Sequence, residues 1–185
     1  RADEFISSVP KYLALYDALE ITPPIMATLP PIMAPDGKKK LGKRDGAKDI
    51  LGYRDDGYLP SAMLNFLVFI GWNPGDETEI ITAEEFIKLF DLSKVQRSGG
   101  GFNEEKLNWI NKEHIKRLSQ KEQLDFVLKY ISSDFAKACG EEKMNRILPT
   151  IIDRISYGKQ VTEMETSGEI DFIIKQPQLD VTMLN

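Results

Sequence analysis

Cysteine and histidine are the residues that this chain has least of, with Cys139 and His114 the single example of each. One cysteine cannot form an internal disulfide, and one residue of each kind is too few for a zinc site built from Cys and His ligands. His114 would also be the only base available to a Ser-His-Asp triad, and no catalytic motif surrounds it. We therefore predict a structural role for His114 inside a helix. Cys139 is predicted to be a buried small apolar residue near a helix end.

Long apolar runs are absent as well. A membrane-spanning helix needs about 18 consecutive apolar residues, and the longest apolar window, residues 62–72, is interrupted by Asn65 and Gly71. No signal-peptide pattern follows Arg1. With 42% apolar and 29% charged residues, the composition is typical of a soluble globular protein, and the single cysteine suits the reducing cytoplasm. Since the sequence begins with Arg1 rather than Met, we expect it to be processed or cut from a longer protein.

A net positive charge is lacking overall, because 29 acidic residues outnumber 24 Lys and Arg residues and give the chain a net charge of −5. Residues 36–48 are the exception: six bases and two acids give this segment +4, which leaves −9 for the rest of the chain. The bases are Lys38, Lys39, Lys40, Lys43, Arg44 and Lys48. A protein that holds nucleic acid by bulk charge is basic throughout. Anion binding by this chain is therefore predicted to be focused on one segment.

Helical spacing dominates the chain outside that segment. Residues 10–19 carry an apolar stripe behind Pro10 and are predicted to form a helix. Short apolar runs in residues 25–34 predict short strands leading into a turn at residues 35–37. A short helix is expected over residues 48–56. Another is opened by Pro60 and directs Met63, Leu64, Leu67 and Val68 toward a core.

Further helices are marked by their start signals. Capping boxes begin at Thr82 and Ser119, and Asn103 is suited to cap a helix through Trp109. Residues 97–101 (RSGGG) predict a flexible connection. We expect one long helix from residue 120 to about Gly140. A helix kinked at Pro149 and a weaker one over 159–174 are expected to follow.

The segment KLGKR at residues 40–44 carries the clearest chemical signal. Lys40 and Lys43, three residues apart on a glycine-flanked loop, can place ammonium groups around a polyphosphate, and backbone N–H groups add neutral donors. Transfer of an acyl group onto the α-phosphate of ATP builds negative charge on the leaving pyrophosphate. A mobile cationic loop that contacts this charge in the transition state lowers the barrier to the transfer. Taken alone, the same residues are much more often those of a solvated basic turn.

The surrounding sequence resembles a known family. PPIMAPDGKKKLGKRDGA at residues 30–47 is similar to the KMSKS-type signature of class I aminoacyl-tRNA synthetases, in the form LPLIL-x-PDGKKLSKR-x-GA of glutamyl enzymes. YRDDGYLPSAMLNFL at 53–67 with GW at 71–72 resembles YR-x-x-GYLPEALLNYL…GW. FNEEKLNWIN at 102–111 resembles FD-x-x-KL-x-WLN, and RADEFISSVP at 1–10 resembles RA-E-E-W-L-x-STP. Residues 116–185 match more loosely, as the start of a helical anticodon-binding region.

The resemblance implies a role for each matching position. Lys43 corresponds to the signature lysine on the ATP phosphates, with Lys40 and Arg44 beside it; Lys40 and Lys43 are the expected catalytic residues. Arg1 corresponds to an arginine that pairs with the side-chain carboxylate of glutamate, for which a guanidinium is well shaped. Phe5 lies where the family has an aromatic residue near the nucleotide, although packing against the 10–19 helix explains it equally well. Expected tRNA contacts are Lys38, Lys39, Trp109 and Lys112.

The sequence also departs from the family pattern. Gly42 replaces the usual serine, Asp45 stands where histidine is common, His114 replaces a frequent tyrosine, and residues 99–101 replace a less flexible segment. These changes bear on the strength of the phosphate contact. A HIGH-type motif, which class I enzymes use for ATP, is absent from the sequence. The chain is therefore expected to be inactive alone. The partners that the resemblance implies are tRNA(Glu), ATP with Mg²⁺ and L-glutamate. No protein-bound metal and no membrane association are expected, and the protein is expected to be a monomer.

These observations predict a mainly α protein with an α/β Rossmann-like remnant. Residues 1–46 would end the catalytic domain, 47–115 would form a helical stem-contact domain, and 116–185 part of a helical anticodon-binding domain, with a seam near 115–120. A glutaminyl enzyme is a weaker alternative, because β-rich barrels follow its signature whereas helical patterns follow residue 47 here. A non-catalytic tRNA-binding or helical interaction module derived from the same family remains the second hypothesis.

Overall fold

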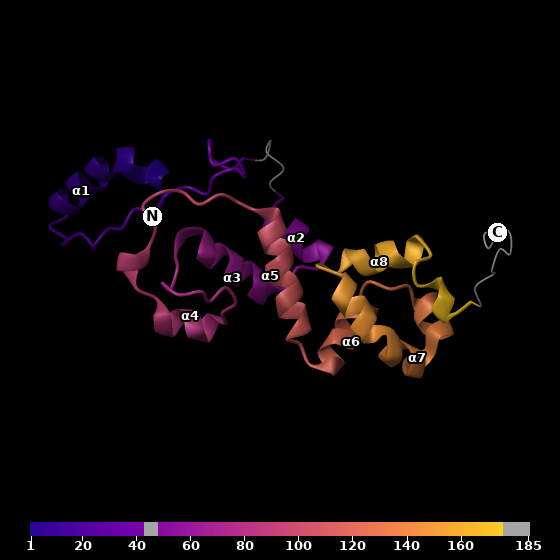
Figure 1. Cartoon of the computed structure of the whole chain (residues 1–185). Coiled ribbons are helices and arrows are strands. Elements are labelled where there is room, and N and C mark those ends of the chain that lie inside the picture. Colours follow the sequence, from indigo (N-terminus) through magenta and orange to yellow (C-terminus); the bar gives the residue numbers. More distant parts are fainter. Residues whose placement is uncertain (43–47, 176–185) are drawn as a thin grey trace. The chain divides into compact units, whose positions relative to one another are not determined.

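The computed structural model describes residues 1–42 and 48–175, and its regular structure is helical (Figure 1). The elements in chain order are η1 (Asp3–Ser8), α1 (Val9–Ala18), α2 (Ile50–Asp56), α3 (Pro60–Gly71), α4 (Ala83–Leu89), η3 (Leu92–Lys94), α5 (Glu104–Lys116), α6 (Gln120–Leu128), α7 (Ser133–Arg154), α8 (Lys159–Thr166) and η4 (Asp171–Ile173). β-Pairing within the described ranges is limited to isolated bridges. The predicted mainly α class is confirmed.

The chain divides into two compact units that alternate along the sequence. Unit 1 comprises Arg1–Lys48 and Leu64–Glu104, and unit 2 comprises Asp49–Met63 and Glu105–Asn185. Helix α3 therefore begins in unit 2 and ends in unit 1, and α5 carries the chain back into unit 2. The division into 1–46, 47–115 and 116–185 concerns the roles of segments in a larger enzyme and stays a prediction.

Unit 1 has an aromatic core around the end of α3. Trp72 is buried, its ring centre lies 5.3 Å from that of Phe86, and its indole N–H donates to the carbonyl of Asp91 at 3.1 Å. Phe66 packs edge to face on Phe102 at 4.9 Å. Such pairs add to the free energy gained by burying apolar area. This core holds α3, α4 and the segment before α5 together.

The inward face of α3 differs from the prediction at two positions. Leu64 and Leu67 are exposed, whereas Asn65 and Phe66 are buried. The buried amide of Asn65 is satisfied, because its Oδ1 accepts from the backbone of Ile81 at 3.0 Å and its Nδ2 donates to Glu79 O at 3.1 Å. An amide with these bonds occupies a core position that the apolar pattern assigns to leucine.

Residues 25–34 do not form the predicted strands. Leu29 and Met33 take part only in isolated bridges, Leu29 with Ala2 and Met33 with Lys40 and Gly101. The prolines at 23, 24, 30 and 31 supply no N–H donors, so a continuous ladder cannot form. Of the Rossmann-like remnant expected at 1–46, residues 1–42 therefore contain isolated β-bridges and no continuous strand. Helix α1 forms close to its predicted bounds, and none of its residues is buried.

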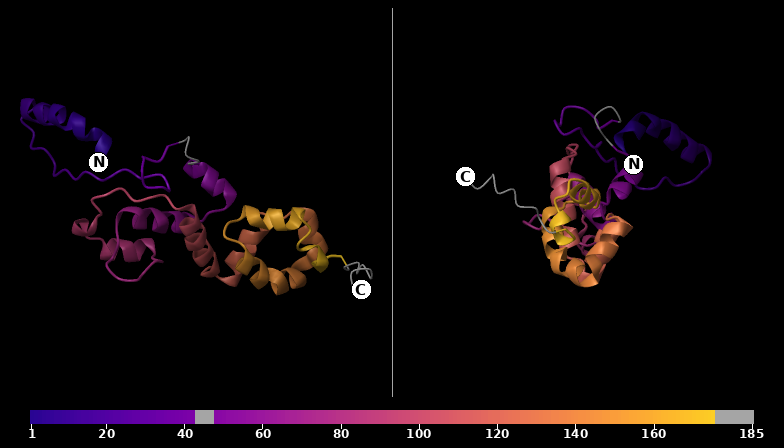
Figure 2. Two further views of the ribbon diagram at one scale, coloured as in Figure 1. Left: turned by 45° about the horizontal axis from the view of Figure 1, so that its top comes forward. Right: turned by 90° about the vertical axis from the view of Figure 1, so that its right-hand side faces the viewer.

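Unit 2 is organised around one apolar core. Its members come mainly from α6, α7 and α8, whose orange and yellow ribbons form a ring in the left view of Figure 2. The fully buried residues include Ile115, Val127, Ile151, Ile155 and Val161. Burial of Cys139 in this core confirms its predicted place. Both predicted capping boxes are present, at Thr82 before α4 and at Ser119 before α6.

The predicted long helix over 120–140 is two helices. Helix α6 ends at Leu128, and Ser132 caps α7 by accepting from the backbone of Phe135 at 3.1 Å. The predicted helix end near Gly140 is confirmed by a break in α7 at this residue, whose φ of 71° is unfavourable for other residues, while Pro149 lies within the helix that follows. The weaker helix expected over 159–174 is divided into α8 and η4. None of the helices in residues 1–42 and 48–175 has the length and hydropathy required to cross a membrane.

Candidate functional site

Residues 32–41 form a small hairpin that presents Lys38, Lys39 and Lys40. Leu41 N donates to Ile32 O at 2.8 Å and Ala34 N donates to Lys39 O at 2.8 Å, so Met33 and Lys40 face each other. The predicted turn at 35–37 is present: Gly37 N donates to Ala34 O at 2.8 Å with φ of 68°, and the Asp36 carboxylate accepts from Lys38 N at 3.0 Å. Ala34 is buried at the base while Lys38, Lys39 and Lys40 are exposed. The hairpin therefore exposes three cations on a fixed base.

The base of this hairpin is held by the glycine segment 99–101. Met33 N donates to Gly100 O at 2.9 Å and Phe102 N donates to Met33 O at 2.9 Å, a single rung of parallel pairing. The backbones approach so closely that a Cβ on Gly99 would lie 2.4 Å from Pro31 O, and one on Gly100 would lie 2.0 Å from Ile70 O. Three consecutive glycines in the sequence predict a flexible connection here. In the structure they allow backbone packing that a side chain would prevent.

Helix η1 and the chain start lie against the same hairpin. Lys40 Nζ lies 3.4 Å from the Glu4 carboxylate, in a pair that is exposed on both sides. The pKa of Glu4 lies below its ordinary value, chiefly because of a backbone hydrogen bond. A side-chain hydrogen bond with Asp3 and the charge of Lys40 lower the pKa further, and desolvation offsets part of this effect. Leu29 N donates to Arg1 O at 2.8 Å, and the Arg1 guanidinium lies 5.0 Å from the Tyr12 ring centre. Unit 1 thereby contains Arg1, Phe5 and Lys40, with Phe5 44% exposed.

Two of the predicted phosphate ligands, Lys43 and Arg44, lie outside the described residues, as does Asp45. The part of the loop that the structure does describe is cationic, with Lys38 to Lys40 on the surface. Within the described ranges there is no group of three or more His, Cys, Asp or Glu residues placed to hold a metal ion. The donor set of the hairpin suits an anion such as polyphosphate.

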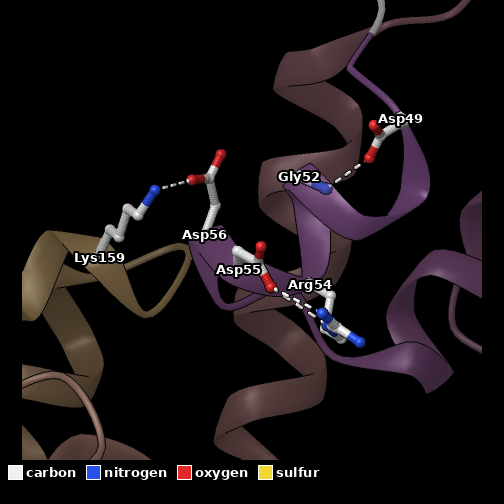
Figure 3. A network of polar contacts seen from close by, with 6 residues as sticks. All are labelled: Asp49, Gly52, Arg54, Asp55, Asp56 and Lys159. Carbon is white, nitrogen blue, oxygen red and sulfur yellow. Dashed lines mark hydrogen bonds and ion pairs between the residues drawn. The ribbon is translucent and has the colours of Figure 1, made fainter.

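Helix α2 follows the loop in sequence and is fixed within unit 2 by side chains at both of its ends (Figure 3). Asp49 caps the helix by accepting from Gly52 N at 2.9 Å. At the other end Asp56 pairs with Lys159 of α8 at 2.5 Å, while Arg54 pairs with Asp55. Gly57, with φ of 93°, accepts from Gly158 N at 3.2 Å. The chain leaving the signature segment is thus attached to α8.

The buried amide of Asn111 joins three segments of unit 2. Its Oδ1 accepts from Leu59 N at 2.8 Å and its Nδ2 donates to Ser156 O at 2.6 Å. Beside it, Tyr58 stacks on Tyr157 with ring centres 5.2 Å apart. Helix α5 therefore ties the α2–α3 connection to the end of α7. The apolar spacing of α5 contains no indication that Asn111 is buried.

Helix α5 carries the two predicted RNA contacts of unit 2. Trp109 is 39% exposed, and Lys106 Nζ lies 5.3 Å from its ring centre, an arrangement typical of a cation–π contact. Lys112 Nζ donates to Asp153 O at 2.5 Å, so its ammonium group also binds the last turn of α7. His114 is buried with Nδ1 3.1 Å from Ser61 Oγ, in keeping with its predicted structural role.

The family follows from this arrangement together with a direct comparison. Residues 1–109 match the family model of "tRNA synthetases class I (E and Q), catalytic domain". That match covers more than half of the chain, so the chain belongs to the class I tRNA synthetases of the glutamate and glutamine branch.

Among individual proteins, the similarity is to glutamate–tRNA ligases. The chain is 43% identical over 184 residues to glutamate–tRNA ligase 1 of Aliarcobacter butzleri, which covers 94% of the chain and 38% of that protein. It is 37% identical over 169 residues to glutamate–tRNA ligase of Dehalococcoides mccartyi, covering 89% and 34%. A crystal structure of a glutamate tRNA ligase from Elizabethkingia meningosepticum, in complex with its amino acid, superposes with a TM-score of 0.82 at 30% identity over 98% of the chain and 39% of that structure. The chain thus spans little more than a third of the length of these relatives.

Proposed function

We propose that the chain provides the signature loop and part of the tRNA-contacting surface of a glutamate–tRNA ligase. Such an enzyme activates glutamate with ATP and transfers it to the 3′ end of tRNA(Glu). The observation that carries the proposal is the 32–41 hairpin, which exposes Lys38, Lys39 and Lys40 above a buried base, in a chain that matches the family over residues 1–109. The proposal places the protein in the cytoplasm as a monomer.

In this proposal different residues of unit 1 and of the signature segment bind ATP and glutamate. Lys40, Lys43 and Arg44 contact the ATP phosphates, and the exposed ring of Phe5 packs on the nucleotide. Arg1 pairs with the side-chain carboxylate of glutamate through its guanidinium. ATP brings Mg²⁺ on its own phosphates, which fits a hairpin made of cations rather than carboxylates.

Lys40 has a further feature that suits a phosphate ligand. Its ion pair with Glu4 lies at the surface, where side chains of 56% and 50% exposure are well solvated. Exposed pairs of this kind are weak, so a polyphosphate can replace Glu4 as the partner of Lys40. The pair would orient Lys40 over η1, next to Phe5, before nucleotide binds.

Binding of tRNA is assigned to residues in both units. Lys38 and Lys39 of the hairpin would contact phosphates, and Trp109 and Lys112 of α5 would contact the acceptor stem. Since the rest of the chain is acidic, affinity should come from a few local phosphate contacts and depend strongly on salt.

The 185-residue chain can test this directly by titration with tRNA(Glu) at several salt concentrations. We expect weak binding at low salt that is lost near physiological ionic strength. Replacing Lys38, Lys39 and Lys40 by Ala should weaken it and reduce the slope of log K against log salt by about two, since Lys38 and Lys39 are the assigned tRNA contacts and each lost phosphate contact lowers the slope by about one.

The matched control replaces three exposed lysines outside the hairpin, Lys11, Lys88 and Lys121, by Ala. This variant has the same net charge as the hairpin variant and should keep the salt slope of the original chain. Equal losses in both triple variants would mean that only bulk charge matters, and would contradict the assignment of tRNA contacts to the hairpin. Binding of tRNA with no effect of the hairpin variant would favour the non-catalytic helical module.

A further inference from the structure

The sequence contains three Asp-Gly pairs, two of which lie within the described residues of the chain. One is Asp36–Gly37 in the 32–41 hairpin, and the other is Asp56–Gly57 at the end of α2. The third, at 45–46, lies outside the described residues. An aspartate before glycine is prone to rearrangement of the main chain, because glycine has no side chain to shield the nitrogen that attacks the carboxyl group. The surroundings of each pair decide whether it is free to react.

The rearrangement passes through a five-membered imide. The glycine nitrogen attacks Cγ of the aspartate, a C–N bond forms, and the hydroxyl of the neutral carboxyl group leaves as water with the amide proton. A water molecule then opens the imide. When water attacks the former main-chain carbonyl, the chain continues through Cβ and Cγ as isoaspartate. Water is the only co-reactant, and nothing is oxidised or reduced.

The Asp36–Gly37 pair has the geometry and the room for this reaction. The Asp36 carboxylate accepts from Lys38 N at 3.0 Å, which closes a ring of atoms that includes Gly37 N and keeps the carboxyl group beside the Gly37 peptide. Beyond its chain neighbours, no atom lies within 4 Å of the place that a Cβ on Gly37 would take. Both residues are exposed. The turn therefore leaves space for the imide and for water.

The Asp56–Gly57 pair is the same dipeptide in closed surroundings. The Asp56 side chain is 13% exposed and pairs with Lys159 at 2.5 Å (Figure 3). A Cβ on Gly57 would lie 2.5 Å from Gly158 Cα and 2.8 Å from Tyr130 Cζ. The ion pair and this packing have to open before the imide can form, which adds to the barrier.

The turn hydrogen bonds do not distinguish the two pairs. Gly37 N donates to Ala34 O at 2.8 Å, and Gly57 N donates to Arg54 O at 3.0 Å. Both glycines also have a positive φ, of 68° and 93°. A difference in reactivity should therefore come from the exposure of the aspartate, its ion pair and the room around the glycine.

We propose that Asp36–Gly37 is a site of spontaneous isomerisation to isoaspartate, and that this modification shifts the cations of the hairpin relative to its buried base. Isoaspartate adds one carbon atom to the main chain between Ala34 and Lys39, and the hydrogen bond from Ala34 N to Lys39 O, at 2.8 Å, fixes the register of the hairpin. The net charge is unchanged, because the product still carries one carboxylate. The inference concerns the covalent structure of the chain and does not depend on the proposed function.

Prolonged incubation of the folded 185-residue chain near neutral pH tests the site. The readout is transfer of a labelled methyl group from S-adenosylmethionine to isoaspartyl carboxylates by an isoaspartyl methyltransferase. Trypsin cleaves after Lys and Arg, so the three Asp-Gly pairs lie in separate peptides, 12–38, 45–48 and 55–88. Label in the first peptide should exceed label in the last by about tenfold, as expected when local opening raises the barrier of the buried pair.

Asp36→Glu is the matched variant, because it keeps the charge while its longer side chain does not form the five-membered imide. It should lose the label in peptide 12–38. Lys159→Ala removes the partner of Asp56 and should raise the label in peptide 55–88 alone. In urea both pairs should be labelled equally, since the dipeptide is the same. Equal label in both peptides of the folded chain, or label in peptide 12–38 no higher than in Asp36→Glu, would overturn the inference.

Hydrogen exchange at Ala34 N measures the structural consequence. Exchange should become faster as isoaspartate accumulates in the original chain, and should stay at its starting value in Asp36→Glu. The same methyltransferase with unlabelled S-adenosylmethionine returns isoaspartate to aspartate through the imide, and it should restore slow exchange. Unchanged exchange in chains that carry the label in peptide 12–38 would show that the hairpin accommodates the added carbon, and would contradict the shift of its cations.

Discussion

Asn65 and Asn111 show how single buried amides fix the connections of this molecule. Each side chain uses its oxygen and its nitrogen to satisfy backbone groups of segments that are distant in sequence. A buried backbone group that loses its partner destabilises the fold by more than the net value of the hydrogen bond, because it is not returned to water. These two residues should therefore be as sensitive to substitution as the apolar core.

We expect Asn111→Ala to lower the free energy of unfolding by about 2–4 kcal/mol, since two backbone groups lose their partners. Urea unfolding of the chain measures this. Asn145→Ala is the control, because the Asn145 side chain has no hydrogen-bonding partner within the described residues of the chain. An Asn111 variant as stable as the Asn145 variant would mean that water replaces both bonds at no loss.

His114 should make stability depend on pH. Burial, and then the charge of Arg117, lower the pKa of His114 below its ordinary value of 6.5. At a pH between the lowered value and 6.5 the unfolded chain binds a proton that the folded chain does not, so stability is full above about pH 6.5 and decreases as the pH falls.

Urea unfolding between pH 7.5 and about pH 5 tests this, because most carboxylates titrate below that range. His114→Gln should show a smaller change over the same range, and it is a clean comparison since the chain has no other histidine. An unchanged pH dependence in the variant would show that His114 is not its source.

At the level of elements, the helix starts could be predicted better than the helix ends. The capping boxes at Thr82 and Ser119 are local patterns in which the side chain and the helix start lie within four residues. The end of α6 at Leu128 has no glycine or proline to mark it, and it depends on Ser132 starting a new helix. Strands in residues 25–34 were wrongly predicted, because apolar alternation outweighed the prolines that remove donors.

The exposed lysines of the hairpin could be predicted from the sequence, whereas the contacts that hold the hairpin in place could not. The lysines of the hairpin and the turn at 35–37 follow from local sequence, as does the exposure of the loop. The rung between Met33 and Gly101 joins positions 68 residues apart, and the Lys40–Glu4 pair joins positions 36 apart. Sequence spacing contains no signal for such pairs, and three glycines in a row indicate flexibility unless the close backbone approach is known.

The glycine segment gives a matched pair of substitutions. Gly100→Ala should destabilise unit 1 by about 1–3 kcal/mol, since its Cβ would lie 2.0 Å from the Ile70 carbonyl oxygen and something must shift. Gly101→Ala should be tolerated, because its Cβ would lie 3.5 Å from Ala34 O, an ordinary contact.

Thermal unfolding and hydrogen exchange at the Met33 amide, which donates to Gly100 O, report on this difference. Faster exchange at Met33 in the Gly100 variant alone would show that the glycine holds the hairpin base. If both variants behave like the original chain, the segment is as flexible as its three consecutive glycines predict.

At the scale of the whole molecule, the proposal makes the chain dependent on catalytic groups that it does not contain. The sequence has no HIGH-type motif, and preorganised groups on one side of a reacting centre cannot replace those on the other. We expect the purified 185-residue chain to show no glutamate-dependent exchange of pyrophosphate into ATP above a blank without protein. Exchange above that blank would mean that this chain holds a complete activation site.

The central claim, that the basic segment is the ATP-phosphate loop of a glutamate–tRNA ligase, is tested most directly by pyrophosphate exchange in a complete ligase that contains this chain. Lys43→Ala should lower kcat for glutamate activation by about 10²–10³-fold, as expected when one donor to transition-state charge is removed. The KM for glutamate should stay unchanged, because the proposal assigns Lys43 to the ATP phosphates, and Lys88→Ala on the exposed surface of α4 should leave both values unchanged. A Lys43 variant with normal kcat and a raised KM for glutamate would contradict the account.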